Sequence, residues 1–201
     1  MHWSEYFIKM AELVAQKSKD PRTKVGNIIV GPDHEIRTTG FNGFPRGVRE
    51  YSLVECTKCN ATGSRRGPSM EVLGDEGFCN ACSGYGKIVS YDLIDQDRWA
   101  SPAKYEYVCH AEANAVYNAA RMGTALEGCT AYFNYEPYPC APCAMALIQS
   151  GVREWVGPAR EFPSSPERTF VCGGEEYLKS VAHQMAAEAG VNILRLPYEG
   201  D

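Results

Sequence analysis

Two short stretches, Cys109-His110-Ala111-Glu112 and Pro139-Cys140-Ala141-Pro142-Cys143, decide how the rest of the chain is interpreted. One histidine and two cysteines can supply three ligands to Zn²⁺, which leaves the fourth tetrahedral position open for water. That arrangement is typical of a catalytic zinc site. Glu112 follows the histidine by two residues and can move protons to and from the water. We therefore predict His110, Cys140 and Cys143 as ligands of a catalytic zinc, and Glu112 as the catalytic acid and base.

Each of these stretches is expected to begin a helix, one over residues 110–122 with Gly123 as its C-cap, and one from Cys140 to about Gly151. The positive end of a helix dipole and its free N–H groups stabilise thiolates, which are the form of cysteine that binds zinc. Cysteines three residues apart on a first turn face the same way. Two helix starts at the ends of neighbouring strands also fit the crevice where open α/β sheets bind ligands.

The hydrophobic periodicity of the whole chain predicts an α/β fold. Outside the two helices above, the expected elements are helices at 3–17 and 175–189 and strands at 25–30, 35–41, 129–134, 152–156 and 191–196, with a loop at 160–173. Late strands separated by helices imply parallel pairing, with helices on both faces of the sheet. The last helix is expected to turn five side chains toward the core: Tyr177, Leu178, Val181, Met185 and Ala189.

Composition and charge narrow the class of protein. The 20 basic and 25 acidic residues give a net charge of −5, whereas binders of duplexes or tRNA usually carry a basic stripe. No apolar run reaches the length of a membrane span, and the first residues lack the pattern of a signal peptide. We therefore expect a cytoplasmic protein with no membrane partner and with little affinity for a large nucleic acid.

Residues 51–104 differ from the rest and are predicted to be a segment inserted into a single domain spanning 1–201. They contain Cys56 and Cys59, then nineteen residues, then Cys79 and Cys82, which is the spacing of a four-cysteine zinc site. Such a short segment cannot bury much core, so the metal would supply most of its folding energy. We predict these four cysteines as ligands of a structural zinc. A nucleic-acid-binding finger is the alternative, and the six basic and seven acidic residues of the segment oppose it.

Three further cysteines fall outside any C-x-x-C pair: Cys109, Cys129 and Cys172. Cysteine outside a metal site usually behaves as a small buried hydrophobe, and this is the expectation for all three. Cys109 adjoins His110, but adjacent side chains diverge, so it is not counted as a ligand.

The H-x-E and P-C-x-x-C signature resembles that of zinc-dependent nucleobase deaminases. The front of the chain resembles the deoxycytidylate (dCMP) deaminases of the cytidine deaminase superfamily more specifically. The matching pieces are Ser18-Lys19-Asp20-Pro21, Lys24-Val25-Gly26 and the segment TGFNGFPRG at 39–47. This resemblance implies a three-layer α/β/α cytidine-deaminase-like fold, with a mixed five-stranded sheet and a small zinc-stapled insertion.

The same resemblance implies an enzyme that hydrolyses dCMP to dUMP and ammonia, which feeds thymidylate synthesis. Zinc would bind at two places, one catalytic and one structural, because some dCMP deaminases carry a second zinc in the inserted region. Many family members are homo-oligomers, often hexamers, that respond to dCTP and dTTP, and a nucleotide effector would bring Mg²⁺ with it.

Three residues are predicted to contact the substrate. Asn42 matches the asparagine that binds the sugar in related deaminases, although Asn-Gly is also a common turn pair. Arg46 is our first choice for the phosphate, and the other candidates are Lys19, Arg22, Lys24 and Arg49. Tyr138, or its neighbour Tyr135, is placed to stack on the base.

The loop before the cysteines departs from the family pattern. The stretch Tyr135-Glu136-Pro137-Tyr138-Pro139 is about two residues longer than the usual connection, so the substrate contacts of this chain are expected to differ there. Three alternatives stay open at this point. They are a deaminase of a 5-modified cytosine nucleotide, a deaminase of tRNA adenosine or single-stranded cytosine, and a non-enzymatic protein that uses the four-cysteine segment as an interaction surface.

Overall fold

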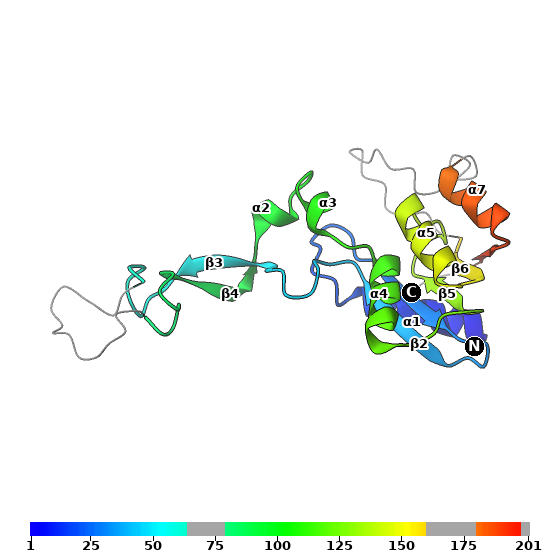
Figure 1. The fold of residues 1–201 in the computed structure, drawn as a ribbon, viewed down its shortest axis with the longest axis horizontal. Helices are drawn as coiled ribbons and strands as arrows, with labels where there is room; N and C mark the ends of the chain where they lie inside the picture. The colour runs from blue at the N-terminus through cyan, green and yellow to red at the C-terminus, as the bar shows by residue number, and fades with distance from the viewer. Residues whose placement is uncertain (64–78, 160–179, 198–201) are drawn as a thin grey trace. The chain divides into compact units, whose positions relative to one another are not determined.

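The computed structural model describes residues 1–63, 79–159 and 180–197, which fall into two compact units (Figure 1). The first unit comprises residues 1–43 together with 108–201, and the second comprises residues 44–107. The predicted insertion at 51–104 falls inside the second unit. No helix in the described part of the chain has both the length and the apolar character needed to cross a bilayer.

The first unit is built on a five-stranded sheet with the strand order β2-β1-β5-β6-β7 (Figure 1). The strands are β1 (Gly26–Val30), β2 (Ile36–Phe41), β5 (Thr130–Phe133), β6 (Glu154–Pro158) and β7 (Asn192–Leu196). Strand β1 runs antiparallel to both β2 and β5, whereas β5, β6 and β7 run parallel to one another. The sheet is therefore mixed, as predicted.

Helices cover both faces of this sheet. On one face, α1 (Trp3–Ala15) packs Phe7 and Ile8 against Ile28, Tyr132 and Val156. The other face carries α4 (Ala111–Met122), α5 (Ala141–Gln149) and α7 (Val181–Glu188). Their inward residues form a second core around the other side of the strands, together with Ile29, Phe133 and Trp155. Because side chains alternate along a strand, one sheet serves both cores. The predicted three-layer α/β/α architecture is confirmed.

The last helix differs from its prediction. Helix α7 begins at Val181, because Ser180 has extended backbone angles and its side-chain oxygen accepts a hydrogen bond from the His183 N–H. Val181 is 64% exposed, so the prediction that it faces the core is wrong. The inward stripe is instead set by the two buried alanines Ala182 and Ala186, and a residue one position earlier points about 100° away. Tyr177, Leu178 and the loop predicted at 160–173 lie outside the described residues.

Helix α4 is fastened to the edge strand β2 at several points. A Cβ on Gly40 would lie 2.1 Å from the Ala111 carbonyl oxygen, so only glycine permits this close approach. The side-chain amides of Asn114 and Asn118, one turn apart, donate to the carbonyl oxygens of Phe41 and Thr39 at 2.8 and 3.0 Å. These bonds use carbonyl groups that an edge strand would otherwise leave unpaired. The start of α4, which carries His110 and Glu112, is therefore held by the sheet.

The second unit has far less regular structure. Strands β3 (Tyr51–Glu55) and β4 (Lys87–Ile94) form an antiparallel two-stranded ribbon, followed by two single-turn helices, α2 (Gln96–Trp99) and α3 (Lys104–Tyr107). Phe44 stacks on Trp99 at 4.4 Å, and Arg98 lies 4.2 Å from the Tyr107 ring centroid. An isolated two-stranded ribbon is marginally stable at best, so this unit needs another source of stability.

Candidate metal centres and active site

Three predicted zinc ligands come together where α4 and α5 begin. His110 and Cys140 are the N-cap residues of these helices, and both have extended backbone angles. His110 Nδ1 lies 3.3 Å from Cys140 Sγ and 3.5 Å from Cys143 Sγ. Ligands around a tetrahedral zinc are separated by about 3.5 Å, given metal–ligand bonds of about 2.0–2.3 Å. The donor atoms therefore have the types and spacing that one zinc ion requires.

Glu112 lies on the first turn of α4, beside this group of donors. The residue is 8% exposed, and burial raises the pKa of its carboxyl group, although the charge of His110 partly opposes that shift. Desolvation favours the neutral form of an acid, so Glu112 can hold a proton nearer to neutral pH than an exposed glutamate can. A group of this kind is suited to taking up a proton and passing it on.

The two thiols of this centre differ in acidity. The Cys143 side chain donates a hydrogen bond to Cys140 and His110 lies beside it, so the pKa of the Cys140 thiol is lowered to about 4. The same contact, together with burial, raises the pKa of the Cys143 thiol. Cys140 is therefore the thiol that ionises first, as expected for a residue at a helix N-terminus.

A second group of donors lies in the second unit. Cys56 and Cys79 are 3.9 Å apart and Cys59 and Cys82 are 3.7 Å apart, measured between their sulfur atoms. Four sulfurs around one zinc are expected to be about 3.8 Å apart, whereas a disulfide would need about 2.0 Å. All four cysteines are buried, and the Gly86 N–H donates to Cys82 Sγ at 3.2 Å. This group has the composition and spacing of a closed structural zinc site.

Asn42, a predicted substrate contact, is buried and its side chain is already bonded within the chain. Its Oδ1 accepts from the Val25 N–H at 2.8 Å, and its Nδ2 donates to the Thr23 carbonyl at 2.9 Å and to Asp20 at 3.4 Å. Asp20 in turn accepts from the backbone of Arg22. The structure thus shows Asn42 shaping the segment that precedes β1, a role that the Asn-Gly turn signal did not suggest.

The other two predicted substrate contacts lie in different units. Arg46 is exposed and belongs to the second unit. Tyr138 is half-buried in the first unit, where it packs against the core and lies beside Arg195. Arg195 also forms an ion pair with the buried Glu136. The sequence did not indicate that Glu136 and Arg195 would pair, because no local pattern links two positions that lie so far apart in the chain.

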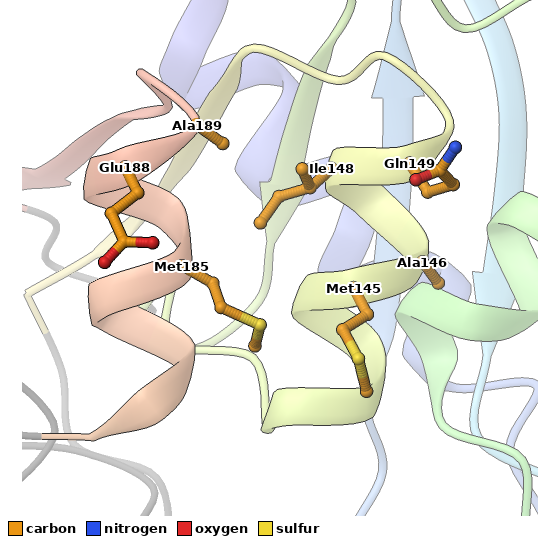
Figure 2. Close-up of a pocket in the computed structure, with 7 residues that line it drawn as sticks. All are labelled: Met145, Ala146, Ile148, Gln149, Met185, Glu188 and Ala189. Carbon is orange, nitrogen blue, oxygen red and sulfur yellow. The ribbon is translucent and has the colours of Figure 1, made fainter.

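A groove between α5 and α7 has a different character from the two donor groups (Figure 2). Its lining is mostly apolar and comes from Met145, Ala146, Ile148, Gln149, Met185, Glu188 and Ala189. None of the predicted ligands or acid–base residues contributes to it. The chemistry suggested by the residues is therefore centred on the three-donor group beside Glu112 and not on this groove.

The sequence matches the family model for the cytidine and deoxycytidylate deaminase zinc-binding region over residues 1–157. The chain belongs to this family. It is therefore an enzyme of the deaminase class, a hydrolase with a zinc-binding region, and the predicted recognition is confirmed.

Relatives extend the match over most of the chain. The deoxycytidylate deaminase of Homo sapiens is 31% identical over 172 residues, which cover 84% of this chain and 71% of the relative. That of Enterobacteria phage T4 is 32% identical over 153 residues, covering 74% of each chain. A crystal structure of the dCMP deaminase from cyanophage S-TIM5 aligns with a TM-score of 0.54 and 20% identity over 96% of both chains, and this likeness concerns the fold.

Proposed function

We propose that this protein hydrolyses dCMP to dUMP and ammonia, acting on the cytoplasmic pool of free nucleotides and supplying dUMP for thymidylate synthesis. The observation that carries the proposal is the meeting of His110, Cys140 and Cys143 with the buried carboxyl of Glu112. The substrate assignment is supported by relatives of 31–33% identity named deoxycytidylate deaminase. A structure of the cyanophage S-TIM5 enzyme in complex with dCMP and dUMP shares the fold.

In this proposal the chain's own residues bind and move protons. His110, Cys140 and Cys143 hold a catalytic zinc, which when bound lowers the pKa of a coordinated water to roughly 7 and so supplies a nucleophile at neutral pH. Glu112 would take a proton from the attacking water as the oxygen adds to the ring carbon that bears the amino group, and would deliver that proton to the ring nitrogen. It would then move the proton of the added hydroxyl group to the amino group, so that the C–N bond breaks, ammonia leaves and the ring carbonyl forms. Because Glu112 is buried, the pKa of its carboxyl group is raised above its ordinary value, which favours uptake of a proton in the course of the reaction.

The second zinc in the proposal is structural and is held by Cys56, Cys59, Cys79 and Cys82. Four sulfur donors complete a tetrahedral shell and leave no position for water or substrate. We further propose that Asn42, Arg46 and Tyr138 contact the sugar, phosphate and base. Assembly into a homo-oligomer and control by dCTP and dTTP, with Mg²⁺ bound to the effector, belong to the same proposal.

The test is ammonia release by the purified protein, measured with dCMP, CMP, dCTP, deoxycytidine, a 5-modified dCMP and a cytosine-containing single strand. Selective turnover of dCMP is the expected result, with dCTP and dTTP tested separately as effectors. Turnover of only the strand or the nucleoside would reject the substrate assignment, and no turnover of any of them by zinc-loaded protein would reject the activity.

A further inference from the structure

The loop that leads into Cys140 contains a buried carboxylate with one charged partner. Glu136 is 6% exposed, and its side chain forms an ion pair with Arg195 on β7, whose side chain is 45% exposed. The second oxygen of Glu136 is buried as well and makes no hydrogen bond within the described residues. A buried carboxylate is costly unless it is paired, so the position of this side chain depends on Arg195.

Arg195 also contacts the tyrosine that follows in the same loop. Its guanidinium carbon lies 5.6 Å from the ring centroid of Tyr138, within the range of a cation–π interaction. The Tyr138 N–H donates to the Glu136 carbonyl oxygen at 2.7 Å, which folds the loop back on itself. One arginine therefore contacts both a buried acid and an aromatic ring that lie two residues apart.

A third contact comes from β6, where Gly157 pairs with Arg195 in the register of the parallel strands. A Cβ on Gly157 would lie 2.4 Å from the Tyr135 carbonyl oxygen and 2.9 Å from Pro137 Cδ. The loop thus lies directly on the backbone of β6. It does so beside the carboxyl ends of the parallel strands, which is the edge where open α/β sheets bind their ligands.

We propose that Glu136 and Arg195 form a positioning pair that fixes the loop at 135–139, and with it the ring of Tyr138, for contact with the substrate base. The pair bonds the loop to β7, and the loop also packs against the backbone of β6 at Gly157. Pro137 and Pro139 restrict the backbone dihedral angles on either side of Tyr138. The conformation of the loop therefore depends mainly on how Glu136 is held by Arg195. The substrate part of this inference rests on the proposed function.

The test compares Arg195→Lys and Glu136→Gln with the wild type in three measurements. These are kcat and KM for dCMP, zinc per chain, and the ¹⁹F NMR signal of 3-fluorotyrosine placed at position 138. Arg195→Lys keeps the charge but loses the planar group beside the ring, and Glu136→Gln removes the charge from the buried end. Both variants are expected to raise KM at least fivefold, to leave kcat within threefold and zinc unchanged, and to shift or broaden the ¹⁹F signal.

Arg153→Lys is the matched control, because Arg153 also forms an ion pair, with Glu127 at 3.2 Å, but at an exposed position. It should change none of the three measurements.

An unchanged KM in both test variants would overturn the proposal even if they were less stable, and so would loss of zinc, since the pair would then support Cys140. If the wild type released no ammonia from dCMP, the proposed function would fail by itself. The ¹⁹F signal would still decide whether the pair fixes Tyr138, and an unchanged signal would overturn that too. Should Arg195→Lys fail to fold, Glu136→Gln alone decides in the same way.

Discussion

The two proposed groups of zinc ligands are held by very different parts of the structure. His110 and Cys140 cap helices that pack on a five-stranded sheet, and the backbone around them is held by close contacts such as that between Gly40 and Ala111. The four cysteines of the second unit lie instead on turns joined to a two-stranded ribbon. The three-donor group is also next to a buried carboxyl group, whereas the four-cysteine group packs against Ile88.

This difference suggests opposite relations between metal and fold. In the first unit, two cores and a sheet hold the proposed ligands in place, so the fold would position the metal. Among the described residues of the second unit, little apolar area is buried apart from the cysteines and a small aromatic group, so a bound metal would support the fold there. Substitutions at the two groups should therefore differ in their effects on folding and on zinc content.

The largest effect is expected from Cys79→Ser, which removes one of four structural ligands. Structural zinc sites contribute about 10 kcal/mol or more to folding, so the second unit should unfold while the sheet of the first unit remains. Limited proteolysis should then cut within residues 44–107, and one zinc per chain should be lost. The control is Lys58→Ala, an exposed position between Cys56 and Cys59. Continued protection of the second unit would show that it folds without its metal.

Cys143→Ser should have the opposite pattern. Loss of one ligand at the three-donor centre is expected to lower kcat/KM by about 10³-fold or more, which corresponds to about 4 kcal/mol of transition-state stabilisation. Circular dichroism should show that the sheet and its helices remain, because their cores do not depend on zinc. Met145→Leu, at an exposed position on α5, is the control. Global unfolding of the first unit would contradict the idea that its fold holds the metal.

Gly40→Ala tests how the sheet supports the three-donor centre. The added methyl group would force α4 away from β2, and overpacking of this kind costs about 3 kcal/mol at the upper end of its usual range. The comparison variant is Gly128→Ala, where the positive φ disfavours alanine but no atom lies within 4 Å of the new methyl group, and about 1 kcal/mol is expected there. Urea unfolding measures both. Equal losses would mean that the contact with Ala111 does not anchor the helix.

The smallest effect is a difference in reactivity between the thiols of Cys140 and Cys129, measured on the protein after zinc has been removed. Because the pKa of Cys140 is lowered to about 4, its thiolate should persist down to about pH 5, where iodoacetamide should still label it. Burial raises the pKa of the Cys129 thiol, so this residue should stay neutral and unlabelled until well into the alkaline range. Mass spectrometry at several pH values reads out both sites. Labelling of the two cysteines with the same pH dependence would contradict this assignment of acidity.

The fold could be predicted largely because its signals are local. The short apolar strands, the C-cap at Gly123 and the family signature were each visible within a few residues of sequence. Val181 was wrongly predicted to face the core, because an apolar residue next to the buried stripe also fits the helical period. Only packing against the neighbouring helix shows that Ala182 and Ala186 form that stripe. The ribbon of the second unit was not predicted, because both cysteine pairs lie between β3 and β4 in the sequence and no short turn joins the two strands.

That the predicted donors lie close together could be anticipated from the cysteine spacing and the H-x-E signature, whereas the contacts around them could not. Cysteines three apart must lie near each other, but the pairing of Glu136 with Arg195 depends on how two distant strands meet in the sheet. The internal hydrogen bonds of Asn42 likewise depend on the path of the chain before β1. Such contacts arise from tertiary structure and leave no periodic trace in the sequence.

The most direct test of the account is Glu112→Gln, with zinc content and ammonia release from dCMP measured on the same sample. Glutamine keeps the shape of the side chain but cannot carry the proton, so turnover should fall by about 10³-fold or more while both zinc ions remain. Glu188→Gln, a surface position on α7, should behave as the wild type. Turnover that survives in a zinc-loaded Glu112→Gln variant would show that the three-donor centre and its buried carboxyl group do not perform the reaction as proposed.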